Sequence, residues 1–262
     1  MSLPPKSPVA GLPISLTSYD EVLGTIAEWS DSEAMVVAVC NVHSIMSARR
    51  DPALRAALVS AHIATPDGVP LVWTLRRTVR ADQSRVYGPD LMRLALKDEA
   101  RRGWKHYLYG STAETLEALQ QSIEEFAPSA AVVGAHAPPF RAFTAEEDAA
   151  DVDRIRSSGA HIVWVGLGMP KQEYWMHRMA PELPGVTLVG VGAAFDFLAG
   201  NVEEAPEWMM RAGLEWLFRL SREPRRLWRR YIWNNPAFVF LVVWQLLHHR
   251  RAAPESAHPG DS

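Results

Sequence analysis

Short apolar runs alternate with amphipathic segments along most of this 262-residue chain. The runs have the length of buried strands, and apolar residues recur at helical spacing in the segments between them. This alternation predicts βαβ units, and therefore an α/β fold with a Rossmann-like, doubly wound, mostly parallel sheet and helices on both faces. The expected strands cover residues 34–40, 62–65, 105–109, 131–135, 161–165 and 186–191.

Helices are expected between these strands. Two pairs of residues have capping-box spacing, Ser111 with Glu114 and Thr144 with Glu147, and the helices they open should run to about residues 126 and 158. Further helices are expected over residues 52–60 and 89–102. Because ligands of such sheets bind outside the carboxyl ends of the strands, the loops that follow the strands are the candidates for a functional site.

The segment from residue 207 to residue 251 differs from the rest of the chain. It contains five of the ten tryptophans and nine arginines against three glutamates, whereas the whole chain has a net charge of −3. Tryptophan prefers the boundary between water and lipid, and clustered arginine is attracted to anionic lipid and phosphate. We therefore expect residues 201–247 to form a helical, basic, Trp-rich appendage at an anionic membrane surface, and residues 248–262 to be disordered.

Two features of this appendage bear on its partners. Its longest nearly apolar run, residues 236–247, is shorter than the roughly 20 residues that a spanning helix needs, so it lies in the interface or packs on the domain. Contact with another subunit is a third way to bury the apolar surface of the appendage, so a homo-oligomer is an alternative. The acidic remainder of the chain argues against nucleic acid. On one continuous helix, a single broad face would carry Arg219, Arg222, Arg226, Arg229 and Arg230.

Other patterns exclude several kinds of site. The single cysteine, Cys40, allows no internal disulfide and gives no zinc pattern. We expect no metal and no other cofactor. Asp151 and Asp153 have the D-x-D form of metal-dependent sugar transferases, but they fall inside an expected helix and not at a strand end. The N-terminus shows no basic segment followed by an apolar one, so we expect no secretory signal.

Two polar residues directly follow expected strands. Asp67 lies in a turn fixed by Pro66 and Gly68, where its carboxylate can take a proton from a substrate hydroxyl. The alternative, which the spacing alone favours, is a turn aspartate that caps the next helix. Asn41 can likewise bind a ligand through its amide or cap a helix.

A turn with two glycines joins another strand to a helix at residues 165–173. Gly166 and Gly168 allow a ligand to approach the backbone, and Pro170 suits a helix start whose N–H groups bind a diphosphate. The turn lacks the third glycine of the dinucleotide fingerprint, which counts against a nucleotide-dependent oxidoreductase. Arg85, just before another helix, can bind phosphate or form a surface salt bridge.

Several segments together resemble the WecG/TagA/CpsF family of glycosyltransferases. The resemblance covers about residues 12–238, and its specificity comes from the order and spacing of the segments. They are TPDGVPLVW (65–73), RVYGPDL (85–91), YLYGS (107–111), VGLGMPKQE (165–173), FDFLAG (195–200) and GLEWLFRLSREPRRLWRRY (213–231).

The resemblance implies an inverting, metal-independent transfer of a hexose from a UDP-sugar to a polyprenyl-diphosphate-linked saccharide, in the synthesis of bacterial surface polysaccharides. It implies a glycosyltransferase domain over residues 1–200 and an appendage that closes over the site and meets the lipid diphosphate through the arginines named above. Such an enzyme is expected in the cytoplasm, peripheral on the inner face of the membrane. Asp67 matches the proposed general base, and Asn41, Arg85 and Gln172 match residues expected near the donor.

The chain departs from the family pattern at two positions. Val39 replaces a threonine two residues before Asn41, and Glu204 replaces an arginine before Ala-Pro. These departures bear on the donor sugar, of the N-acetylmannosamine or the glucose type, more than on the reaction. Residues 41–58 look like the exopolysaccharide branch. The two rival functions are the oxidoreductase and a membrane-associated scaffold of a polysaccharide assembly complex without catalysis.

Overall fold

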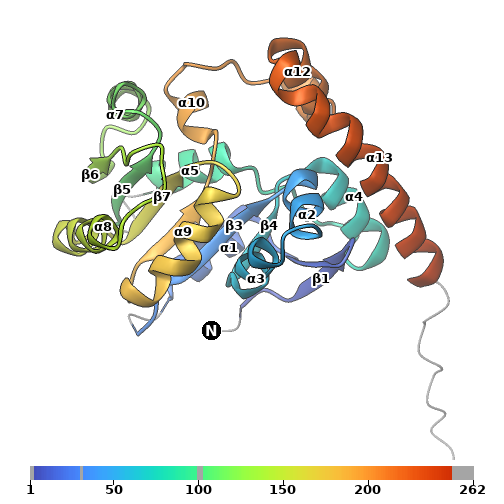
Figure 1. The fold of residues 1–262 in the computed structure, drawn as a ribbon, viewed down its shortest axis with the longest axis horizontal. Helices are drawn as coiled ribbons and strands as arrows, with labels where there is room; N and C mark the ends of the chain where they lie inside the picture. Colours follow the sequence, from blue (N-terminus) through green and yellow to red (C-terminus); the bar gives the residue numbers. More distant parts are fainter. Residues whose placement is uncertain (1–2, 30–31, 99–102, 250–262) are drawn as a thin grey trace, which may run out of the picture.

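A parallel sheet forms the centre of the molecule. In the computed structural model, which describes residues 3–29, 32–98 and 103–249, six strands pair in the order β4-β3-β8-β7-β5-β6 (Figure 1). They are β3 (Met35–Cys40), β4 (Ile63–Pro66), β5 (Lys105–Gly110), β6 (Ala131–His136), β7 (Ile162–Gly166) and β8 (Thr187–Gly190). Each strand end lies within one residue of its expected position. A separate antiparallel hairpin consists of β1 (Lys6–Val9) and β2 (Leu12–Ser15).

Helices cover both faces of the sheet, so the predicted doubly wound α/β architecture is confirmed. On β3, Met35 and Val37 pack into one core, and Val36 and Ala38 pack into the other, because successive side chains of a strand point to opposite faces. The first core includes α1 (Tyr19–Ala27), α5 (Gly88–Lys97), α7 (Ala113–Phe126) and α10 (Ala194–Leu198). The second includes α2 (Val42–Ala48), α3 (Pro52–Ser60), α4 (Val69–Thr78), α8 (Ala145–Ser158) and α9 (Lys171–Met179), which continues into the 3-10 turn η1 (Ala180–Glu182).

Of the two capping boxes expected from the sequence, one is present and the other is not. Thr144 and Glu147 form the expected capping box of α8. The expected box at Ser111 and Glu114 is wrong, because Ser111 has a left-handed backbone with φ of 58°. Thr112 caps α7 instead and accepts a hydrogen bond from the N–H of Thr115. Helix α5 ends at Lys97, and residues 99–102 of the expected helix lie outside the described residues.

The C-terminal segment forms α11 (Glu207–Arg211), α12 (Glu215–Arg222) and α13 (Pro224–His249). Helix α13 runs beside α2 and α4 (Figure 1). Phe238 is buried there, and Gln245 donates to the carbonyl of Pro8 at 2.7 Å and accepts from the N–H of Ala10 at 2.8 Å. The apolar run is thus part of a longer helix, and none of the described helices has the length and apolar character to cross a bilayer. Residues 250–262 of the expected disordered tail lie outside the described residues.

The basic face expected on one continuous helix is not formed. Helix α12 ends at Arg222, and α13 begins at Pro224, after Glu223. Proline suits the first turn of a new helix but lacks the N–H that would continue the old one. Arg219 and Arg222 therefore belong to α12, whereas Arg226 and Arg229 belong to α13. The two pairs do not lie on one face of a single helix.

Candidate active site

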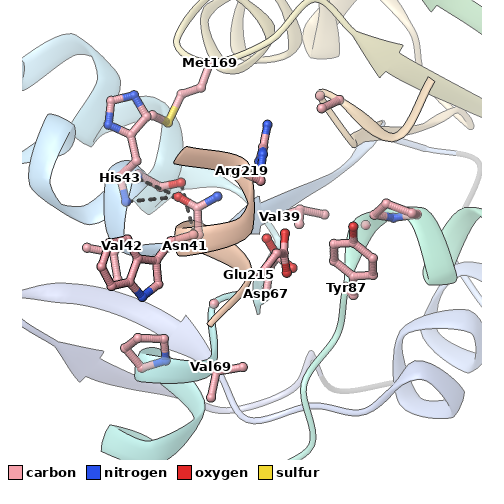
Figure 2. A pocket seen from close by; sticks show the side chains of 18 of the residues that line it. Val39, Asn41, Val42, His43, Asp67, Val69, Tyr87, Met169, Glu215 and Arg219 are labelled. Carbon is pink, nitrogen blue, oxygen red and sulfur yellow. Dashed lines mark hydrogen bonds between the residues drawn. The ribbon is translucent and has the colours of Figure 1, made fainter. Parts of the chain in front are cut away.

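A cavity of about 610 Å³ lies over the carboxyl ends of the strands. Its floor comes from the residues that follow β3, β4, β7 and β8, and its wall from α12 and α13. Figure 2 shows Asn41, Asp67, Tyr87, Glu215 and Arg219 around this space. The loops that follow the strands, where ligands of such sheets bind, thus meet at this cavity. The C-terminal helices α12 and α13, far away in the sequence, join them there.

Asp67 follows β4 directly and does not cap the next helix. Gly68 is the N-cap of α4, and no side chain caps that helix. The backbone N–H of Asp67 bonds to the carbonyl of Cys40 at 2.9 Å, which ties the turn to β3. Its carboxylate accepts from the Arg85 guanidinium at 3.2 Å and from the side chain of Asn41. The structure therefore favours the ligand-facing interpretation of Asp67 over the capping one.

The pKa of the Asp67 carboxyl is raised from its ordinary value to about 6, because burial and the nearby Glu215 carboxylate both disfavour its charged form. The charge of Arg85 and the hydrogen bonds from Arg85 and Asn41 act in the opposite direction. Desolvation is the largest of these effects. The group is therefore ionised near neutral pH but basic enough to take a proton.

Glu215 lines the cavity, although no pattern in the sequence singles it out. It lies at the start of α12, and its carboxylate accepts from the Arg85 guanidinium at 2.6 Å. Arg85 also stacks over the ring of Tyr87, with its central carbon 4.3 Å from the ring centroid. Arg85 thus joins Asp67 on the α/β body to Glu215 on the C-terminal segment, and its salt bridges are partly buried at the cavity instead of lying on the open surface.

Asn41 has one of its two expected roles, that of a helix cap, and it also lines the cavity. Its side-chain oxygen accepts from the N–H groups of His43 at 3.0 Å and Ser44 at 3.3 Å, which makes it the N-cap of α2. Its side chain also bonds to Asp67. His43 beside it contacts Ser47 and Asn234 through its ring, so it links α2 to α13.

The turn after β7 contributes less backbone to the cavity than expected. Gly166 does not line it; a side chain there would meet the Phe195 ring at 2.6 Å, so this glycine allows tight packing. Gly168 lines the cavity and has φ of 72°, which favours glycine. Pro170 has no N–H, and the N–H of Gln172 is bonded to the carbonyl of Gly168 at 3.0 Å. The start of α9 therefore offers few free N–H groups to a diphosphate.

Gln172 and Glu173 form a buried polar pair at the cavity. The amide nitrogen of Gln172 donates to Glu173 at 2.9 Å, while the amide oxygen of Gln172 and the second carboxylate oxygen of Glu173 have no hydrogen-bond partner within the described part of the chain. Burial raises the pKa of the Glu173 carboxyl to about 7. Unpaired buried polar atoms at a cavity are available to a ligand.

The four selected arginines divide into two pairs. Arg219 and Arg226 line the cavity, whereas Arg222 pairs with Glu203 and Arg229 stacks over Trp228. Arg226 is held by Glu223 at 2.6 Å, but the buried Nε of Arg219 has no hydrogen-bond partner among the described residues. Arg219 is thus the cation best placed to meet an anionic group of a ligand.

The two departures from the family pattern occupy different places. Val39 lines the cavity, so a hydroxyl contact is replaced by an apolar one. Glu204 is not a lining residue; it pairs with Arg93 at 2.8 Å.

The D-x-D pair lies within α8, as expected, and away from the cavity. Asp151 is buried there and accepts from the Tyr109 hydroxyl at 2.6 Å and from Arg154 at 2.7 Å. In the described part of the chain, no group of three or more His, Cys, Asp and Glu side chains is arranged to hold a metal ion.

A doubly wound sheet with a buried carboxylate and two arginines at a cavity over the carboxyl ends of its strands is typical of an α/β enzyme. The chain belongs to the glycosyl transferase WecG/TagA/CpsF family, whose model matches residues 7–252. It is similar to an N-acetylglucosaminyldiphosphoundecaprenol N-acetyl-beta-D-mannosaminyltransferase of Bacillus spizizenii, with 29% identity over 94% of this chain and 91% of the relative. The protein is therefore a glycosyltransferase, and the oxidoreductase and scaffold alternatives are set aside.

Proposed function

We propose that this protein transfers a hexose from a UDP-sugar to a saccharide linked to polyprenyl diphosphate, with inversion and without a metal ion. The observation that carries the proposal is the Asp67 carboxyl, which faces the cavity with a pKa of about 6. The name of the Bacillus spizizenii relative describes an acceptor of this lipid-linked kind, which supports the choice of acceptor.

The reaction is a single displacement at the anomeric carbon. Asp67, ionised at neutral pH, takes the proton of the acceptor hydroxyl while that oxygen attacks the sugar. The new carbon–oxygen bond forms on one face as the bond to the diphosphate breaks on the other, so the configuration inverts. Asn41 and Arg85 hold the carboxylate in place through hydrogen bonds.

The departing UDP gains negative charge that the protein must stabilise. Arg219 and Arg226 supply guanidinium groups at the cavity, and guanidinium binds phosphate through paired N–H groups. Arg226 is proposed to meet the departing UDP, and Arg219, whose buried Nε has no hydrogen-bond partner among the described residues, is proposed to meet the diphosphate of the lipid acceptor. Gln172 presents an unpaired amide oxygen at the same cavity and is proposed to contact the donor sugar.

Residues 201–247 form the proposed appendage that completes the site at the membrane. Glu215, Arg219 and Arg226 reach the cavity from this segment, and exposed tryptophans such as Trp208 and Trp244 suit a lipid interface. The protein would then act on the inner face of the cytoplasmic membrane, in the synthesis of a bacterial surface polysaccharide. The donor is proposed to be of the N-acetylmannosamine or the glucose type.

The test is a transfer assay with a prenyl-diphosphate saccharide and a panel of UDP-sugars, run with EDTA and with added Mg²⁺. We expect product from one donor at equal rates in both conditions, and NMR of the product should show the anomeric configuration opposite to that of the donor. Retained configuration, or a rate that depends on Mg²⁺, would contradict the proposed mechanism. A folded protein that gives no product with any donor would contradict the proposed substrates.

A further inference from the structure

A second cavity, of about 680 Å³, lies between α12 and α13. Apart from Asn235, its lining residues are aromatic, aliphatic or proline, and they include Leu220 on α12 and Phe240 and Val243 on α13. We call this cavity the apolar groove. It is open enough that Phe240 is 69% exposed and Val243 is 49% exposed. Apolar side chains gathered in a groove favour an apolar occupant.

The apolar groove adjoins the catalytic cavity. Trp216, Tyr231, Asn235 and Val239 line both spaces. The rings of Trp216 and Tyr231 are 5.7 Å apart between centroids and tilted by 59°, so they form a shared aromatic wall. A molecule bound along this wall has one part in the catalytic cavity and another in the apolar groove.

Helix α12 presents a charged side chain to the catalytic cavity and an uncharged one to the apolar groove. Arg219 lies one helical turn after Trp216 and faces the catalytic cavity, with its buried Nε unpartnered. Leu220, the next residue of α12, faces the apolar groove. Helix α12 thus presents a cation to one space and an aliphatic side chain to the other, which matches an amphiphile with an anionic group joined to a hydrocarbon chain.

We propose that the apolar groove binds the isoprene units next to the diphosphate of the acceptor lipid. This inference rests on the proposed function and adds a protein subsite for the hydrocarbon, distinct from the bilayer. The saccharide lies toward Asp67, the diphosphate lies near Arg219, and the first part of the prenyl chain leaves along Trp216 and Tyr231 between α12 and α13.

The subsite predicts that affinity for the acceptor depends on its hydrocarbon even when no membrane is present. Burial of each CH₂ group changes affinity by about fourfold. Partial burial of a five-carbon isoprene unit should therefore lower KM by about tenfold, until the groove is filled. A bilayer that only concentrates the lipid would give no such dependence in free solution.

The experiment uses the full-length protein in buffer without vesicles or detergent. The acceptors carry the same saccharide diphosphate on a methyl group or on one, two or three isoprene units, each below its micelle concentration. The groove variants are Phe240→Ser and Val243→Asn. The matched control is Trp233→Ser, because Trp233 is 70% exposed on the same helix and lines neither cavity. Circular dichroism and thermal melting check that each variant is folded.

For the wild type and Trp233→Ser, we expect KM to fall by about tenfold per unit and then level off. For the two groove variants, the dependence on chain length should be largely lost. Three results would overturn the subsite: equal KM for all acceptors in the wild type, an unchanged dependence in the folded groove variants, or a dependence that arises only when vesicles are added. If no acceptor is used at any length, the proposed function fails and the subsite fails with it.

Discussion

Arg85 divides its hydrogen bonds between two carboxylates at the catalytic cavity. It donates to the Glu215 carboxylate at 2.6 Å and to the Asp67 carboxylate at 3.2 Å, while its Nε donates to the backbone carbonyl of Asp67, so the closer of the two carboxylates is not that of the proposed base. This division leaves the charge of Asp67 only partly compensated, which is consistent with its raised pKa. The reactivity of Asp67 therefore depends on its neighbours as much as on its own position.

The raised pKa of Asp67 predicts the pH dependence of transfer. Asp67 acts as a base only when it is ionised, so kcat/KM should rise with pH through about 6 and level off above about 7. The measurement is kcat/KM for the lipid acceptor between about pH 4.5 and 8.5. A rate that stays constant down to the lowest pH would contradict the assignment of Asp67 as the base.

Glu215→Gln tests the coupling between the two carboxylates. The negative charge of Glu215 raises the pKa of Asp67, and its removal also frees Arg85 to bind Asp67 more closely. The pKa of Asp67 should fall, and the acid limb of the pH–rate profile should move to lower pH. Glu207→Gln is the matched control, because Glu207 lies on α11, pairs only with Arg211 among the described residues, and lines neither cavity. An acid limb that stays in place or moves to higher pH in Glu215→Gln would refute the coupling.

At the scale of elements, Asn41 begins α2 and also bonds to the proposed base. Asn41→Ala removes the N-cap, at a cost of about 1 kcal/mol, and should lower Tm by about 2–4 °C. Asn41→Ser keeps a capping oxygen but loses the amide that donates to Asp67, so Tm should hardly change. Both variants should show a reduced kcat/KM. Calorimetry and transfer rates together separate the two roles, and a fully active Asn41→Ser would show that the amide has no part in the reaction.

The central elements could be predicted from the sequence because local pattern and burial agree in them. Helix α3 has the expected bounds, since Asp51 caps it and Pro52 opens it. The box at Ser111 was misplaced because the tight turn after β5 puts that residue in a left-handed conformation, which capping-box spacing alone does not reveal. The continuous basic helix was wrong because Pro224 starts a new helix.

Site residues could be predicted where they directly follow a strand or precede a helix start. Asp67 and Asn41 could be selected by position, because they come directly after β4 and β3. Glu215 could not, since it is 130 residues from Arg85 and its contact depends on how α12 packs on the body. Which of the arginines face the cavity also depends on how α12 and α13 pack on the body, so it could not be predicted either. Tertiary contacts between distant segments leave no periodic signal in a sequence.

At the scale of the whole molecule, charge is separated between the body and the C-terminal segment. Vesicles that contain anionic lipid should bind the protein at low salt, and high salt should weaken binding by screening. The double variant Arg225→Gln/Arg229→Gln should weaken binding by about fivefold per arginine, because each basic residue near the surface contributes about 1 kcal/mol. Co-sedimentation with vesicles measures this.

The control for this experiment is Arg141→Gln/Arg156→Gln, which removes two charges from the exposed surface of the body. It should bind vesicles as the wild type does. Equal loss in both double variants would show that the attraction comes from overall charge, and binding that does not depend on salt would contradict an electrostatic contact of the C-terminal segment.

The central claim is that Asp67 removes the proton of the acceptor in metal-free glycosyl transfer. The most direct measurement is kcat/KM of Asp67→Asn and the wild type for the same lipid acceptor, with EDTA and with the donor that the panel identifies. We expect a loss of at least about 100-fold with an unchanged Kd for the UDP-sugar. Tm should not fall, because a carboxyl whose folded pKa lies above its unfolded value loses its stabilising contribution as pH rises through about 6, so its charge opposes folding at neutral pH. A folded Asp67→Asn protein with the wild-type kcat/KM would show that Asp67 is not the base.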